Sequence, residues 1–339
     1  MTVADVLPAE LLEAARERFA ANWQVSLAGQ RFVVRPQSPL PSGQVQRIVP
    51  EPRQLLNAMA STFATRGVPA AGLLPIRWGR DTDLTISAVQ ALDPWLKDGI
   101  NRVWREGFLP QPVVRFTGER DAQGHLKEGY LTSFCNVSCV QRIASVADHV
   151  RLLDIWIEAL SAIGIHARRL TIQGDLVCWQ RGPVSGITWF ITCDSAVFAD
   201  AVLLWHNDNP LSMATDIGSG LERIRWILSR ANWAETTFGP AARRFDTELL
   251  DAVRTATLLV MAGIRPSASG TGSALRRVLR SIPSDMAAAG LGRLVRAQRA
   301  YWTAIGMTGP DWPQLATLVE DEVLAMTATR PTYARNVCP

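Results

Sequence analysis

The chain is organised around the stretch Asp216-Ile217-Gly218-Ser219-Gly220-Leu221-Glu222-Arg223. Two glycines at this spacing let a backbone turn sharply and let a ligand approach the main chain. Glu222 and Arg223 then begin a predicted helix over residues 220–230, whose N-terminus carries positive dipole character. An arginine fixed there can hold a polyphosphate through paired hydrogen bonds. The stretch therefore predicts a phosphate-binding connection, although an ordinary strand-to-helix turn with an exposed ion pair would have the same pattern.

The composition is typical of a soluble globular protein that buries a large core. The 339 residues are 47% hydrophobic and 19% charged. No run approaches the ~20 apolar residues that a membrane-spanning helix needs, and acidic residues near the N-terminus argue against a signal peptide. We therefore expect a cytoplasmic protein with no membrane partner. The net charge of +4 permits binding to phosphates without requiring it.

Five cysteines lie scattered through apolar segments, a pattern that is typical of reduced thiols packed as small hydrophobic groups. Cys135 and Cys139 are four residues apart and His149 follows, but the second closely spaced pair of a zinc site is missing. We therefore expect no protein-bound metal. The remaining cysteines are Cys178, Cys193 and Cys338.

The pattern of apolar residues predicts an α+β fold. Helices are expected over residues 8–21, 52–67, 146–162, 247–262 and 273–282, with two more before the end of the chain. Residues 22–48 are expected to form a loosely structured, hairpin-like leader. The runs 113–117 and 130–134 flank a polar turn and predict a hairpin with a long loop, and further strands are expected over 169–173, 187–193 and 201–206. This arrangement favours a mainly antiparallel sheet flanked by helices, followed by a helical C-terminal domain.

Residues 216–223 resemble motif 3 of class II aminoacyl-tRNA synthetases, and their sequence is most similar to that of the alanyl enzymes. Downstream, the runs 263–267 and 275–280 look like the helical region of that family. Upstream, Trp179-Gln180 with the following glycines is similar to its active-site segment. From about residue 50 to about residue 330, the similar segments occur in the same order as in that family. It implies an N-terminal extension over 1–48, a class II catalytic domain over 49–235 and a helical domain over 236–339.

The resemblance also implies which residues handle ATP. Arg115 falls at the place of the motif 2 arginine, which contacts the α-phosphate, and a cross-strand surface role is its alternative. Arg223, with Gly218, Gly220 and Glu222, would bind the remaining phosphates, with Mg²⁺ bridging them. Adenylation drives a carboxylate onto a phosphorus that is surrounded by negative oxygens, so fixed guanidinium groups must offset the charge. ATP and Mg²⁺ are the implied cofactors.

The amino-acid site follows from the same comparison. Asp216 aligns with the acidic residue that holds the α-ammonium group of the substrate, and a helix N-cap is its alternative role. Trp179 would form a wall of the pocket beside Gly186, and core packing is the alternative for the indole ring. These residues predict a small amino acid as substrate.

Three departures from the family bear on the substrate and the acceptor. The second motif 2 strand has Cys135 where the family has an acidic residue. The strand 200–205 lacks the asparagine that lies over the substrate methyl group, so the amino acid need not be alanine. The loop 267–271 has serines and threonine in place of asparagines that read the tRNA acceptor stem, and hydroxyls cannot pair bidentately with a base edge. The editing and oligomerising parts of the family would lie beyond Pro339.

The expected function is therefore ATP-dependent activation of a small amino acid, followed by transfer to an acceptor other than the family's tRNA. That acceptor would be a small molecule, a nucleoside or a carrier protein in a specialised pathway such as antibiotic biosynthesis. A minimal tRNA-charging enzyme and an aminoacyl-tRNA-dependent transferase remain alternatives. So does a non-catalytic paralogue that acts as an amino-acid sensor or partner subunit. Residues 85–110 would hold the motif 1 helix and strand, through which class II domains form homodimers.

Overall fold

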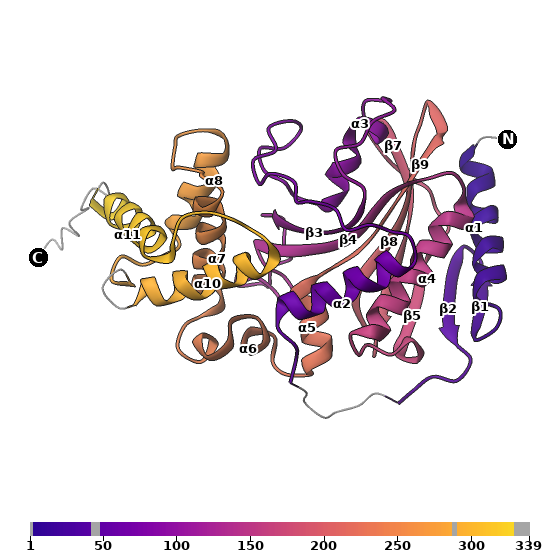
Figure 1. Cartoon of the computed structure of the whole chain (residues 1–339), viewed down its shortest axis with the longest axis horizontal. Helices are drawn as coiled ribbons and strands as arrows, with labels where there is room; N and C mark the ends of the chain where they lie inside the picture. The colour runs from indigo at the N-terminus through magenta and orange to yellow at the C-terminus, as the bar shows by residue number, and fades with distance from the viewer. Residues whose placement is uncertain (1–2, 42–47, 287–289, 329–339) are drawn as a thin grey trace, which may run out of the picture. The chain divides into compact units, whose positions relative to one another are not determined.

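The computed structural model describes residues 3–41, 48–286 and 290–328, which divide between two compact units (Figure 1). The sheet unit comprises Met1–Leu74, Thr85–Val113 and Phe134–Thr237. The helical unit comprises Pro75–Leu84, Val114–Ser133 and Phe238–Pro339. Residues expected to form an N-terminal extension thus belong, as far as they are described, to the sheet unit. Two internal segments of the chain join the C-terminal region in the helical unit.

A large sheet forms the centre of the sheet unit, so the predicted α+β class is confirmed. Within the described residues it has nine strands in the order β1-β2-β5-β7-β8-β9-β4-β3, with β6 paired to β7. Along this order, every neighbouring pair of strands from β1 to β4 is antiparallel. The strands are β1 (Trp23–Ala28), β2 (Arg31–Pro36), β3 (Gly107–Val114), β4 (Ser133–Ile143), β5 (Leu170–Asp175), β6 (Trp179–Arg181), β7 (Val184–Cys193), β8 (Ala196–His206) and β9 (Asn209–Gly220).

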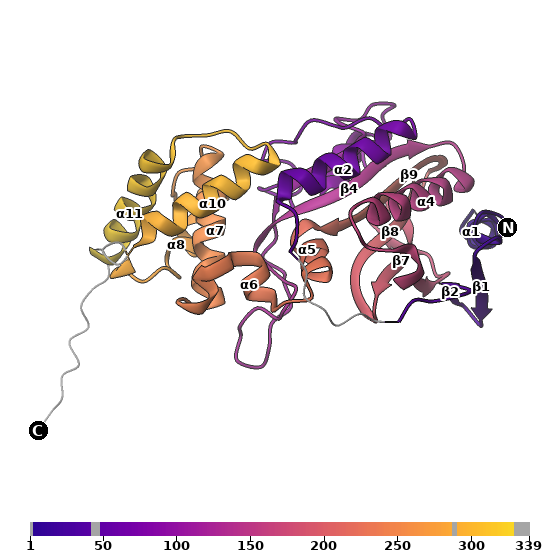
Figure 2. The same ribbon diagram turned by 60° about the horizontal axis from the view of Figure 1, so that its bottom comes forward.

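Three helices of this unit begin and end close to their predicted bounds or extend them. They are α1 (Val3–Phe19), α2 (Pro52–Thr65) and α4 (Val146–Ala162). The helix α4 contacts β8 and β9, and α1 and α2 pack against α4, as Figure 2 shows for α2 and α4. Within the described residues, no helix is long and apolar enough to cross a membrane. The predicted leader contains the β1–β2 hairpin, and its residues 42–47 lie outside the described ranges.

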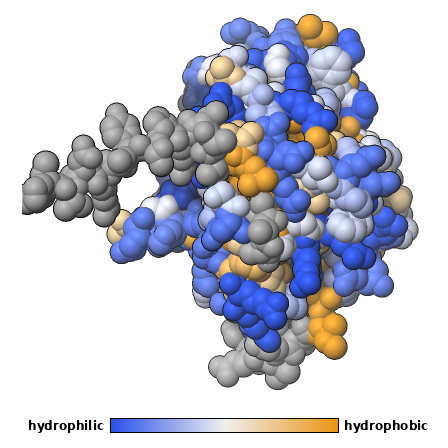
Figure 3. Space-filling model, turned by 90° about the vertical axis from the view of Figure 1, so that its left-hand side faces the viewer, coloured by the Kyte–Doolittle hydropathy of each residue, from blue (hydrophilic) through white to orange (hydrophobic). Residues whose placement is uncertain are grey.

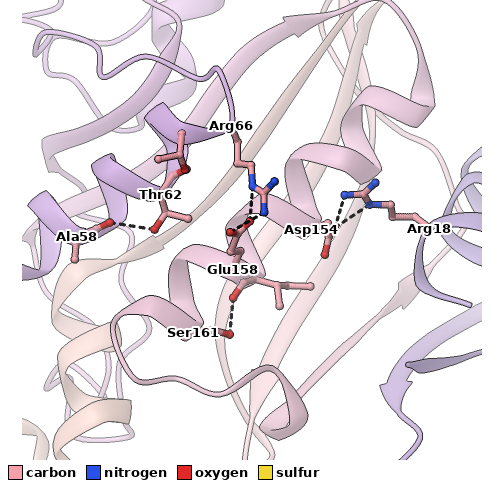
Figure 4. A network of polar contacts seen from close by, with 9 residues as sticks. Arg18, Ala58, Thr62, Arg66, Asp154, Glu158 and Ser161 are labelled. Atoms are coloured by element: carbon pink, nitrogen blue, oxygen red, sulfur yellow. Dashed lines mark hydrogen bonds and ion pairs between the residues drawn. The ribbon is translucent and has the colours of Figure 1, made fainter. Parts of the chain in front are cut away.

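Ion pairs join these three helices at their exposed edges (Figure 4). Arg66, just after α2, donates to both carboxylate oxygens of Glu158 on α4 at 2.9 and 3.0 Å. Arg18 on α1 donates to Asp154 on α4 at 2.8 Å. Because all four side chains are about half exposed, solvent screens both pairs, and apolar packing supplies most of the stability.

Alternation along parts of β7, β8 and β9 gives the sheet one buried face and one partly open face. On the buried face, His149 of α4 lies 2.6 Å from the hydroxyl of Thr215 on β9, between Nδ1 and Oγ1. Burial lowers the pKa of His149 to about 3, so this imidazole is neutral and serves the core. Neighbours on the same face are fully buried, among them Ile187, Trp189, Ala201, Leu203 and Ile217. The opposite face is only partly covered.

The predicted hairpin over 113–117 and 130–134 is wrong in its bounds. β3 ends at Val114 and β4 begins at Ser133, so the intervening residues leave the sheet. Contacts within the helical unit explain this difference. The guanidinium carbon of Arg277 lies 3.7 Å from the ring centroid of Phe116, and the backbone N–H of Thr132 donates to Asp251 at 2.9 Å.

The region 85–110, expected to hold a motif 1 helix and strand, contains only short helical turns before β3. These are η1 (Ala88–Leu92) and α3 (Asp93–Leu96). The turn η1 is fixed to β4 because the backbone N–H of Ala88 donates to Oδ1 of Asn136 at 3.0 Å. Two further helices, α5 (Leu221–Ser229) and α6 (Trp233–Phe238), follow β9 along the chain, and η2 (Ala167–Arg169) precedes β5. The predicted helix over 220–230 is confirmed as α5.

The helical unit is built on α7, which is buried from Leu249 to Met261. Its main elements are η3 (Gly239–Arg243), α7 (Thr247–Met261), α8 (Gly270–Leu279), α10 (Leu291–Ile305) and α11 (Trp312–Ala328). Arg254 of α7 is 0% exposed and lies between two aromatic rings of α10, with its guanidinium carbon 4.0 Å from the centroid of Tyr301 and 4.4 Å from that of Trp302. Buried polar groups of α7 thereby fix α10 in the core of this unit.

We expect Asp251 to make the helical unit less stable as the pH rises. Burial raises the pKa of this carboxyl to about 6 from 3.8, although hydrogen bonding to Thr132 and, to a smaller extent, the charge of Arg254 act in the opposite direction. Because the folded pKa lies above the unfolded one, the contribution of Asp251 is fully present below pH 3.8 and is lost as the pH rises through about 6. The unfolding free energy of wild type relative to Asp251→Asn should fall by about 2–3 kcal/mol over that range.

Urea unfolding at pH values between 4 and 7.5 measures this difference. Asp285 is exposed in the same unit, so Asp285→Asn is the matched control and should follow wild type at every pH. A difference between wild type and Asp251→Asn that stays constant over this range would contradict the assignment.

Candidate functional site

The open face of the sheet brings Asp216 into one row with residues of two neighbouring strands. Asp216 of β9 pairs with Val202 of β8, and Val202 pairs with Thr188 of β7. Directly paired residues of antiparallel strands point to the same face. All three are partly exposed, whereas their neighbours Ile217, Ala201 and Leu203 are buried on the other face. The row therefore forms a floor that is accessible from one side and has a polar side chain at each end.

Trp179 and Gly186 lie at one end of this floor and are in contact. Trp179 of β6 pairs with Gly186 of β7, and its indole Nε1 donates to Oγ1 of Thr188 at 2.9 Å. A Cβ at Gly186 would lie 2.6 Å from Cζ2 of Trp179, so the ring fills that space. Gly186 therefore positions Trp179, which is itself partly exposed and faces the row of Asp216.

Gly218 does not form the sharp turn that the sequence predicts. The strand β9 continues to Gly220, and neither glycine has a positive φ. A Cβ at Gly218 would lie 2.3 Å from Oγ of Ser138 and 2.9 Å from the carbonyl oxygen of Val137, both on β4. Gly218 is thus required by the neighbouring strand, whose Ser138 accepts a hydrogen bond from Asn136 at 3.0 Å. The space above Gly218 is filled by protein.

Gly220 is the glycine of this segment that leaves room for a ligand. A Cβ at Gly220 would lie 3.7 Å or more from its nearest neighbours, and one of these is Cγ of Arg223 at 3.8 Å. Arg223 is partly exposed in the first turn of α5, where the helix N-terminus favours an anion. Gly220 and Arg223 therefore lie together at the end of the strand that carries Asp216.

Glu222 has a structural role in this arrangement. It is 2% exposed, and both carboxylate oxygens accept the backbone N–H of Cys135 on β4, at 3.2 and 3.3 Å. These hydrogen bonds fix the first turn of α5 to the sheet. A buried carboxylate would repel a phosphate, so of these two neighbours only Arg223 is kept as a candidate for phosphate binding.

Arg115 belongs to the helical unit, one residue beyond the end of β3. Its backbone N–H donates to the carbonyl oxygen of Thr132 at 2.7 Å. This hydrogen bond joins the two ends of the segment 114–133. The side chain is partly exposed. The predicted place of Arg115 on a strand is therefore wrong by one residue, and its phosphate role stays a prediction.

Asp200 is a residue of the open face that the sequence comparison did not select. It pairs with Gly218, so it lies on the same face as Asp216 and diagonally next to it. Asp200 is exposed, whereas Ala199 and Ala201 on either side of it are buried. A charged residue between apolar neighbours on a strand was the sequence signal that Asp200 lies on the open face.

Three of the four cysteines of the sheet unit are buried thiols. Cys135, Cys139 and Cys193 are buried, and Cys178 is partly exposed. Burial raises the pKa of Cys139 to about 12, with a further contribution from the charge of Asp216, and raises that of Cys193 to about 11. Cys338 lies outside the described residues. Among the residues that the structure describes, no three His, Cys, Asp or Glu side chains gather as a metal site.

Comparison with known proteins adds no family. No protein-family model matches the chain, and no curated protein sequence matches it. The residues of the open face and of α5 are therefore the basis on which a function can be proposed.

Proposed function

We propose that this protein activates a small amino acid as an aminoacyl-adenylate, and that its sheet unit is a class II synthetase-like fold. The supporting observation is the open sheet face, on which Asp216 and Trp179 flank a floor of small and polar residues. Strands lie ~4.8 Å apart, so Thr188 and Asp216, two strands from one another, are separated by about 10 Å. That spacing suits one small amino acid.

In this proposal Asp216 accepts hydrogen bonds from the α-ammonium group, and the indole of Trp179 forms the opposite wall. A carboxylate oxygen of the amino acid attacks the α-phosphorus of ATP, and the bond from that phosphorus to the β-bridging oxygen breaks. Pyrophosphate leaves with its negative charge offset by Arg223 at the start of α5 and by the Mg²⁺ that accompanies ATP. The resemblance assigns stabilisation of the charge at the α-phosphorus to Arg115.

The acyl group then passes to an acceptor whose nucleophile attacks the carbonyl carbon and displaces AMP. We propose an acceptor other than the family's tRNA, because hydroxyl-bearing residues occupy the loop 267–271. The alternatives are a minimal tRNA-charging enzyme, an aminoacyl-tRNA-dependent transferase and a non-catalytic sensor.

Amino-acid-dependent exchange of pyrophosphate into ATP tests the proposal. We expect exchange with a small amino acid, and we expect Asp216→Asn and Arg223→Ala each to lower kcat/KM about a hundredfold. Asp208→Asn and Arg53→Ala are the matched controls, because both residues are exposed in the sheet unit away from the floor. Both controls should retain exchange.

Folded protein that shows no exchange with any small amino acid would overturn the proposal. Binding of amino acid and ATP without exchange would favour the sensor. If exchange occurs, charging of bulk tRNA would identify a tRNA-charging enzyme, and acyl transfer from aminoacyl-tRNA without ATP would identify the transferase.

A further inference from the structure

The helical unit contains a cavity that is open to solvent, with a volume of about 450 Å³ and mostly exposed lining residues. Three short segments line it: residues 77–83, the loop 263–269 and the first turn of α8. Cavities that take small organic ligands measure about 300–1,000 Å³, so this one is larger than a single ion needs. The lining residues that bear on ligand binding are Arg77, Asp83, Arg265, Ser269, Thr271 and Gly272.

Two arginines from different segments supply positive charge to this cavity. Among the residues that the structure describes, neither Arg77 nor Arg265 has a hydrogen-bond or ion-pair partner for its guanidinium group. The charge of the unit has the same sign. The sheet unit carries as many acidic as basic residues, so the whole net charge of +4 falls on the helical unit. The cavity therefore favours an anion.

The first turn of α8 adds hydrogen-bond donors to the two cations. Ser269 is the N-cap and makes no side-chain cap hydrogen bond, so the N–H groups of this turn are left without a cap. Gly272 lets the loop 263–269 pack closely against the first turn of α8. A Cβ at this position would lie 2.1 Å from Oγ of Ser267 and 2.5 Å from the carbonyl oxygen of Arg265. This close crossing holds Arg265 beside the uncapped end of the helix.

We propose that this cavity binds a small phosphorylated compound, with the phosphate held between Arg77, Arg265 and the first turn of α8. Phosphate accepts the paired hydrogen bonds of a guanidinium group and is favoured at a helix N-terminus. The remaining volume takes a small organic group that bears a hydroxyl, for which the carboxylate of Asp83 is the acceptor. The site does not depend on the adenylation proposal.

The surface of this part of the protein suits a polar ligand. Figure 3 views the left-hand side of Figure 1, where α8 and α11 lie, and hydrophilic residues dominate it. Hydrophobic residues form small, separate patches there. A small polar ligand therefore fits this surface better than an apolar docking partner.

Calorimetric titration of the full chain with inorganic phosphate, glycerol 3-phosphate and a short RNA duplex tests the proposal. We expect glycerol 3-phosphate to bind more tightly than inorganic phosphate, and Arg77→Ala and Arg265→Ala each to weaken it about tenfold. Asp83→Asn should tighten inorganic phosphate about two- to fivefold, because one negative charge is removed from the lining. Arg293→Ala, an exposed arginine of α10, is the control and should leave binding unchanged.

Three results would overturn the proposal. They are no saturable binding of either phosphate compound, equal weakening by Arg293→Ala, and binding of the RNA duplex alone. The two proposals separate in this experiment. Arg223→Ala should keep phosphate binding while exchange falls about a hundredfold, and Arg77→Ala should keep exchange while phosphate binding weakens about tenfold.

Discussion

Replacing Arg254 by alanine should destabilise the helical unit more than any other single substitution considered for it, by about 3–5 kcal/mol. The guanidinium group is 0% exposed and donates to the carbonyl oxygen of Ser133 at 3.0 Å and to Oε1 of Gln298 at 3.2 Å. Alanine would leave both acceptors buried without these donors and would open a cavity between Tyr301 and Trp302. The single substitution therefore incurs both the cost of the unpaired acceptors and the cost of the cavity.

Urea unfolding followed by tryptophan fluorescence measures the loss, and two further variants separate its causes. Arg254→Met keeps most of the volume without the donors, so we expect its free energy of unfolding to lie between those of wild type and Arg254→Ala. Arg293→Ala is the exposed control and should stay within about 0.5 kcal/mol of wild type. A loss below about 1 kcal/mol for Arg254→Ala would show that the buried cluster does not hold α7 and α10 together.

A pair of glycine substitutions should separate the structural glycine of the open face from the one beside a ligand. Gly218→Ala places a Cβ 2.3 Å from Oγ of Ser138 and 2.9 Å from the carbonyl oxygen of Val137, so β4 and β9 must move apart. We expect a loss of about 2–3 kcal/mol in the free energy of unfolding. At Gly220 a Cβ meets nothing closer than 3.7 Å at a φ of −70°, so Gly220→Ala should fold as wild type does.

The same unfolding experiment provides the control for this pair. Ser138→Ala removes the hydroxyl that collides with the new Cβ, so combining it with Gly218→Ala should recover part of the lost stability. If both alanine variants unfold alike, the close approach of Ser138 to Gly218 does not determine the sequence there. Loss of exchange by the well-folded Gly220→Ala would support ligand approach at this glycine.

Local pattern was enough to predict the long helices and parts of three strands. Leu55, Leu56, Met59 and Phe63 recur at helical spacing, and all four are buried on α2, which begins at Pro52. Strand alternation likewise predicted parts of β5, β7 and β8. Predictions of this kind succeed because periodicity and capping depend on residues a few positions apart.

The connection between β3 and β4 shows where local pattern failed. Residues 115–117 and 130–132 have strand-like composition but lie outside the sheet. Their partners are Arg277 and Asp251, which are more than a hundred positions away in the sequence and in the helical unit. Contacts at that separation leave no periodic signal in a single sequence, so strand ends could not be read from it.

The stretch 216–223 shows the same division between what local sequence determines and what the tertiary structure determines. The sequence alone determined that residues 216–223 pass from an apolar run into a helix, with an aspartate and an arginine at either end. Only the tertiary structure decided what each member does, since Ser138 occupies the space above Gly218, and the backbone N–H of Cys135 donates to Glu222. The physical reason is that a missing side chain or a buried carboxylate acquires its role from the neighbour that fills or meets it, and that neighbour lies on another strand.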